Sequence, residues 1–168
     1  METSSNRISA SIIVSTGFKV FEIGKGMEFC VLLVLKNESD DPKKVAAGKW
    51  TFAGGKREGE ESSKGCAQRE NMQEVGFWIT EKGLIRIGWI EGYATRGSTE
   101  RLWNVAVYTT HHDEFLPEII LEPAELQEYR WFRFSEIPWD KMMSSDVRWL
   151  PKAIDMKEFH EIVYFDEL

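Results

Sequence analysis

One 23-residue run, from Gly55 to Phe77, places charged residues and glycines at spacings that are unlikely to arise by chance. It reads GKREGEESSKGCAQRENMQEVGF. Within it Glu70 and Glu74 stand four residues apart, so on a helix both carboxylates lie on the same face. Two neighbouring carboxylates repel each other unless a divalent cation neutralises them, and hard oxygen ligands favour Mg²⁺ or Mn²⁺. The run therefore predicts a helix with a metal-binding face, although an isolated acidic pair at this spacing is more often a solvated surface.

Both ends of this helix are marked in the sequence. Ser62 is a suitable N-cap, and Gly76 suits the left-handed residue that closes a helix. Before the helix, the segment WTFAGGK predicts a short strand and then Gly54 and Gly55, where the backbone can approach a phosphate closely. Because protein-bound Mg²⁺ usually works together with substrate phosphates, a glycine turn facing an acidic helix predicts a diphosphate site.

The spacing of the marked residues resembles the Nudix box. The matching positions, in chain order, are Gly55, Glu61, the pair Arg69–Glu70, Glu74, Gly76 and the hydrophobic Phe77. This resemblance outweighs the solvated-surface interpretation. It implies an α/β protein with the Nudix fold, in which a mixed β-sheet is sandwiched between helices (an α/β/α sandwich), and it implies metal-dependent hydrolysis of a nucleoside diphosphate linked to a further group.

Two positions inside the run depart from the family pattern. Gln73 stands where the family has the first glutamate of a pair, so a carbonyl oxygen remains but a charge is lost. Asn71 stands at an apolar position between Ala67 and Val75, on the stripe that we expect to face the sheet. A buried amide costs free energy unless it is hydrogen-bonded. One interpretation of both changes is neutral substitution. The other is a box that has lower activity, or that binds its ligand without cleaving it.

The C-terminal segment EYRWFRFSEIPWDKMMSSDVRWLPKAIDMKEFH carries a second resemblance. It is similar to the closing part of the MutT-homologue branch, which hydrolyses oxidised purine nucleoside triphosphates and so sanitises the nucleotide pool. The shared elements are a Trp-Phe strand, an Ile-Pro turn and a late Trp-x-Pro. About 120 residues, from the strand before the box to the last helix, can be laid against that branch.

Catalytic and metal-binding roles follow from these resemblances by position. They imply that Glu70 and Glu74 bind the metal and act in catalysis, that Arg69 braces the helix against the preceding loop, and that Gly54 and Gln73 are further candidate metal-site positions.

An additional acid is expected outside the box. Glu128, three residues before Trp131, stands where many Nudix enzymes have a further metal ligand or base, and Glu125 is a nearby alternative. A solvated loop acid is the competing interpretation of both residues.

Candidate substrate-binding residues come from the same comparison. Gly55 and Lys56 are placed to meet a phosphate, although an exposed lysine is an equally good interpretation. The branch reads its purine with a Trp, two adjacent Asp residues and an Asn; here those positions are Met143, Ser145–Asp146 and Thr51. Asp146 can hydrogen-bond a base edge and Met143 can contact a base face. The two-carboxylate reader is absent, so the preference for oxidised guanine does not carry over.

Composition limits the remaining possibilities. The chain has 168 residues, 42% of them hydrophobic and 29% charged, which fits a single domain over residues 8–168 behind a flexible N-terminus at 1–7. A formal charge of -7 argues against general nucleic-acid binding. We find no transmembrane run or signal peptide and expect a cytoplasmic protein with reduced cysteines, as a monomer or homodimer.

Local patterns predict strands and two helices. We expect strands over residues 8–15, 29–35 and 129–134, a long hairpin over 84–110, and a second helix over 149–159. We assign most of the tryptophans, including Trp103, to the core, and we place His111 and His112 in a solvated loop.

The expected function is hydrolysis of a nucleoside triphosphate, possibly oxidised, to a monophosphate and pyrophosphate. One alternative is a Nudix-fold module that binds or senses a nucleotide and cleaves it weakly or not at all. The other is hydrolysis of a sugar nucleotide, a dinucleotide or an RNA 5' end.

Overall fold

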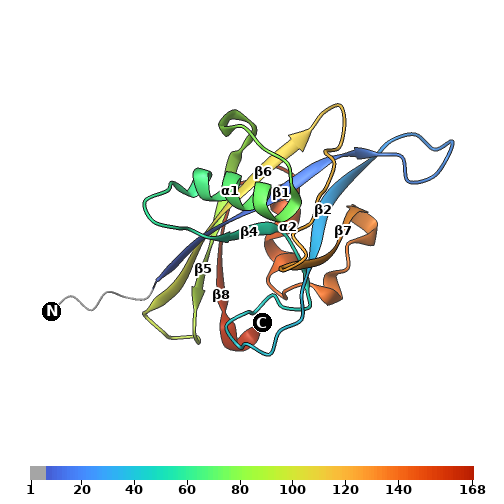
Figure 1. Cartoon of the computed structure of the whole chain (residues 1–168). Helices are drawn as coiled ribbons and strands as arrows, with labels where there is room; N and C mark the ends of the chain where they lie inside the picture. Colours follow the sequence, from blue (N-terminus) through green and yellow to red (C-terminus); the bar gives the residue numbers. More distant parts are fainter. Residues whose placement is uncertain (1–6) are drawn as a thin grey trace.

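A single mixed sheet contains all the strands of the computed structural model, which describes residues 7–168 (Figure 1). The strands are β1 (Ile8–Lys19), β2 (Glu28–Lys36), β3 (Trp50–Thr51), β4 (Ala53–Lys56), β5 (Ile85–Tyr93), β6 (Arg101–His112), β7 (Leu126–Arg133) and β8 (Phe159–Tyr164). Their main order is β3-β2-β1-β6-β5-β8, with β4 beside β1 and β7 beside β2. The predicted hairpin is confirmed as the antiparallel pair of β5 and β6.

The two α-helices pack against opposite faces of the sheet. Along β1, the side chain of Ile13 packs in a cluster with Ala67 of α1 (Ser63–Val75), whereas the adjacent Val14 packs in a cluster with Leu150 of α2 (Asp146–Ile154). Adjacent residues of a strand point to opposite faces, so α1 and α2 lie on different sides. The predicted α/β fold with a mixed sheet between helices is confirmed.

The glycine segment lies beside the first strand. β4 pairs with residues 10–13 of β1, and β2 pairs with residues 16–19, while β6 runs parallel along the other side of β1. Gly54 and Gly55 therefore lie opposite Ile12 and Ser11, next to the helix α1 that covers this part of the sheet.

Two local predictions near the ends of elements were wrong. The helix predicted over 149–159 is α2, which spans Asp146–Ile154 and is followed by Met156 with a left-handed φ of 55°. Phe159 instead begins β8, parallel to β5. No glycine or proline in the segment between them marks the change. The predicted loop at His111 and His112 is the end of β6, and the His112 ring packs against two aromatic rings.

The prediction for the N-terminus is not tested by the described part of the chain. Residues 1–6 lie outside the described part, so the flexible N-terminus predicted for 1–7 stays a prediction. Within residues 7–168, no helix has both the length and the apolar character needed to cross a membrane.

Candidate functional site

The predicted ends of α1 are confirmed. The Ser62 side chain accepts a hydrogen bond from the Gly65 N–H at 3.0 Å, which caps the helix. Gly76 has a φ of 81°, and its N–H donates to the carbonyls of Asn71 and Met72. These caps fix the helix in register, so that its acidic side chains meet the glycine segment of β4.

Asn71, the unusual amide within α1, is fully buried. Its Nδ2 donates to the carbonyl oxygen of Phe77 at 2.7 Å, while its Oδ1 is buried without a hydrogen-bond partner. The amide therefore ties the helix to the chain just beyond its end. This bond offsets part of the desolvation cost that an apolar residue at the same place avoids.

Arg69 connects the helix to the loop that precedes it. Its guanidinium donates to both carboxylate oxygens of Glu61, at 3.1 and 2.7 Å, and to the carbonyl of Lys56 at 2.9 Å. It also donates to Glu70 at 2.8 Å and to Oε1 of Gln73 at 3.1 Å. The guanidinium holds the pKa of Glu61 down, at about 2. Both oxygens of Glu61 are thus engaged by Arg69.

Glu70 and Glu74 flank the glycine segment. A Cβ on Gly55 would lie 2.5 Å from the carboxyl carbon of Glu70, and a Cβ on Gly54 would clash with the backbone of Ser11. Glycine at both positions is therefore required for this close approach. The Oε2 of Glu74 accepts from the Gly54 N–H at 3.3 Å.

Glu74 is the most buried carboxylate of the box, with 5% of its surface exposed. Burial raises its pKa, against the lowering effect of the Lys36 ammonium and the Gly54 N–H. The Nζ of Lys36 lies 2.9 Å from Oε1 of Glu74. A carboxylate in this setting needs a cation beside it to stay ionised.

The donor set fits a divalent cation that keeps part of its shell free. No group of three or more His, Cys, Asp or Glu side chains converges on one point in residues 7–168. Glu70 and Glu74 supply two carboxylates at the glycine segment, and the Lys36 ammonium shows that positive charge is accommodated at Glu74. Mg²⁺ commonly takes one or two carboxylates and completes its shell with water and phosphate oxygens. Gln73 can offer only a carbonyl oxygen, which already accepts from Arg69.

A cavity of about 540 Å³ opens beside this segment. All five residues predicted to bind substrate line it: Thr51, Gly55, Lys56, Met143 and Asp146. Apolar side chains from β1, β5, β6 and β8 line part of this cavity. The structure thus brings the glycines of the box and the expected base-reading residues to one cavity.

Asp146 lies buried at one end of this cavity, with 3% of its surface exposed. Its Oδ1 accepts from the indole N–H of Trp149 at 3.1 Å, and its Oδ2 is buried without a partner. Burial raises the pKa of Asp146 to about 7. Near neutral pH this carboxyl can therefore either accept or donate a hydrogen bond.

Trp103 also lines the cavity, although its sequence pattern predicts a core position. Its ring packs edge-on against Phe165 at 6.0 Å, and the Lys56 ammonium lies 6.0 Å from its centre. The signal that could have identified it is strand alternation, because Trp103 shares a face of β6 with Val105, which also lines the cavity.

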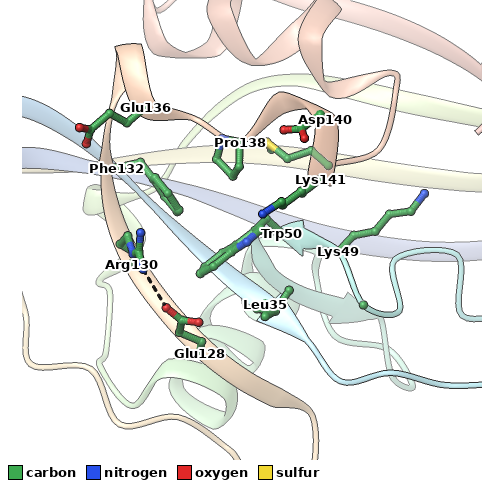
Figure 2. A pocket seen from close by; sticks show the side chains of 12 residues that line it. Leu35, Lys49, Trp50, Glu128, Arg130, Phe132, Glu136, Pro138, Asp140 and Lys141 are labelled. Atoms are coloured by element: carbon green, nitrogen blue, oxygen red, sulfur yellow. Dashed lines mark hydrogen bonds and ion pairs between the residues drawn. The ribbon is translucent and has the colours of Figure 1, made fainter.

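Glu128 is not brought to the box. It pairs with Leu35 across β2 and β7, whereas the next residue of β2, Lys36, points to Glu74 on the opposite face. Figure 2 shows Glu128 paired with Arg130. Both residues line a second cavity, of about 750 Å³, together with Trp50. Glu128 therefore faces away from the glycine segment, whereas Glu125, its neighbour in sequence, lies at the cavity that Gly54 and Gly55 line.

The sequence matches a known family over most of its length. Residues 15–153 match the model of the NUDIX domain. The chain is 35% identical over 115 residues to an oxidized purine nucleoside triphosphate hydrolase of Danio rerio and 30% identical to one of Mus musculus, and each match covers 67% of both chains.

Solved structures share the fold. The MutT protein of Methanosarcina mazei superposes with a TM-score of 0.65 at 19% identity, over 92% of this chain and 97% of that one. The NUDIX domain of Shewanella oneidensis NrtR, in complex with ADP ribose, gives a TM-score of 0.66 at 11% identity, over 89% and 87%. The chain therefore belongs to the NUDIX family, in its MutT-like branch, and is a Nudix hydrolase.

Proposed function

We propose that this chain hydrolyses nucleoside triphosphates to a monophosphate and pyrophosphate with the help of Mg²⁺ or Mn²⁺. The observation that carries the proposal is the cavity that runs from Gly54 and Gly55 to the buried carboxyl of Asp146. Glu70 and Glu74 lie against the same two glycines. The similarity to relatives named as hydrolases of oxidised purine nucleoside triphosphates supports this substrate class.

Glu70 and Glu74 hold the cation, which when bound screens the phosphate charges and lowers the pKa of bound water. Gly54 and Gly55 let the phosphates approach the backbone. Arg69 keeps the helix and the loop in place through its bonds to Glu61 and Glu70. Glu125 is the proton acceptor that we favour outside the box, because it lines the same cavity.

The base occupies the apolar part of the cavity. The free Oδ2 of Asp146 bonds its edge, and Met143 and Thr51 line the same end. Trp103 offers an aromatic wall at which a base can stack. Because this single carboxyl can either accept or donate a hydrogen bond, it suits several different purine bases and does not select one purine.

The test is a hydrolysis screen with Mg²⁺ and with Mn²⁺ over canonical and oxidised nucleoside triphosphates, ADP-ribose, sugar nucleotides and dinucleotides. We expect the highest kcat/KM on a triphosphate, with pyrophosphate as a product. Release of single phosphates, or activity confined to ADP-ribose or dinucleotides, would contradict the proposal.

A second candidate rests on Gln73, which removes one anionic ligand from the box. It is a module that binds a nucleotide and cleaves it slowly. Binding of a nucleoside triphosphate at micromolar concentration with turnover near background in the same screen would favour this candidate.

A further inference from the structure

Lys36 and Glu74 form a nearly buried ion pair at the centre of the candidate site. The ammonium Nζ lies 2.9 Å from Oε1 of Glu74, and the side chains are 22% and 7% exposed. The two residues come from different elements, the end of β2 and the last turn of α1. The pair therefore forms only when the helix is docked on the sheet.

Lys36 links Glu74, which does not itself line the cavity, to that space. Lys36 lines the same cavity as Gly54 and Gly55, and the other oxygen of Glu74 accepts from the Gly54 N–H at 3.3 Å. One oxygen of Glu74 is thus held by the backbone and the other by a side-chain cation. A divalent cation that binds Oε1 must take the place of the ammonium, because two cations at one oxygen repel each other.

We propose that Lys36 is an internal counter-ion that neutralises Glu74 in the metal-free protein and leaves it when a divalent cation binds. The inference rests on the proposed function, because it assigns Glu74 to the metal. A buried carboxylate without a partner is costly, so the ion pair stabilises the packing of α1 on the sheet before metal arrives. The same pair lowers metal affinity, since binding must first break it.

The released ammonium stays within the cavity. Lys36 is fixed at the end of β2, and its side chain is long and flexible, so Nζ can turn from Glu74 toward an anion in the same space. Metal binding and capture of a phosphate then become coupled through one lysine. The exchange predicts that metal increases the affinity for a phosphate-bearing ligand in the unmodified chain more than in a variant without this lysine.

The test measures Mn²⁺ binding without substrate, by titration calorimetry or by the electron paramagnetic resonance of free Mn²⁺. We expect K36M to bind Mn²⁺ roughly tenfold more tightly than the unmodified chain, and K36R to stay close to it because the cation is retained. The matched control is K43M, which removes an exposed lysine from the rim of the same cavity. Unchanged or weaker Mn²⁺ binding by K36M overturns the proposal.

A second measurement uses the unmodified chain, in case K36M does not fold. Acetylation of lysines by a water-soluble reagent is followed residue by residue with mass spectrometry. We expect Mn²⁺ to increase the modification rate of Lys36 several-fold and to leave that of Lys43 unchanged. A rate for Lys36 that does not respond to Mn²⁺ overturns the exchange, and hydrolysis of nucleotides by the same sample shows that the proposed function survives this failure.

Discussion

At the scale of single residues, the box departs from the family pattern at two positions with different structural consequences. Gln73 lies on the exposed side of α1 and accepts from Arg69, so the loss of its charge affects the site rather than the core. Asn71 is buried and bonded to Phe77, so it affects the attachment of the helix. Only the first substitution lies at the candidate site.

Restoring the missing charge tests the role of Gln73. In Q73E a third carboxylate joins Glu70 and Glu74, so we expect the Mg²⁺ concentration for half-maximal rate to fall several-fold. The matched control is M72E, which adds the same charge at an exposed neighbour on the same helix. Equal behaviour of the two variants in steady-state kinetics would show that the position carries no metal-site function.

The buried Asp146 makes stability depend on pH. Its folded-state pKa is raised to about 7, so the folded chain binds more protons than the unfolded chain at mildly acid pH. The stability present at low pH is therefore lost as pH rises toward 7. We expect D146N to remove on the order of 2 kcal/mol of the decline between pH 5 and 8, measured by urea unfolding. The control is D155N, which changes an exposed residue at the other end of α2. Its stability should decline with rising pH as that of the unmodified chain does.

At the scale of elements, α1 is positioned by its caps and by the contact of its C-terminus with the segment around Ile120. The Gly76 φ of 81° requires glycine, and a Cβ there would lie 2.8 Å from that of Ile120. The orientation of the acidic face of α1 depends on this end of the helix.

Substitution of Gly76 separates strain from crowding. G76A introduces both a left-handed alanine and a clash, so we expect it to lower the free energy of unfolding by about 2 kcal/mol or more. Gly97 has a similar φ of 83° with nothing near its Cβ position, so G97A should cost only about 1 kcal/mol. Equal losses in denaturant unfolding would mean that the Ile120 contact does not hold the helix end.

The elements also show what could be predicted from the sequence. Periodicity and capping residues identified α1, the β5–β6 hairpin and the glycine segment, because each is determined by local patterns. The end of α2 was missed because Met156 adopts a left-handed conformation without a glycine to signal it. Glu128 was a candidate because many Nudix enzymes have an acid at its position, three residues before Trp131, whereas strand alternation places it on the face away from Glu74.

At the scale of the whole molecule, the site is assembled from segments far apart in the chain. The glycines of β4, Lys36 of β2 and Asp146 of α2 line one cavity, and β4 is held there by its pairing with β1. The acids of α1 lie against the same glycines. The sequence predicted most of the members of this site. It could not predict the Lys36 ion pair, because that pair depends on how α1 packs on the sheet, whereas strand alternation along β6 could have placed Trp103 at the cavity.

The most direct test of the account is the steady-state rate of nucleoside triphosphate hydrolysis by E74Q and by E128Q, each checked for folding by circular dichroism. We predict that E74Q loses at least about 100-fold in kcat while its fold is retained, because Glu74 is the buried carboxylate at the glycine segment. E128Q should keep the rate of the unmodified chain, because Glu128 lies in the other cavity. Full activity in E74Q, or its loss in E128Q, would contradict the placement of the active site.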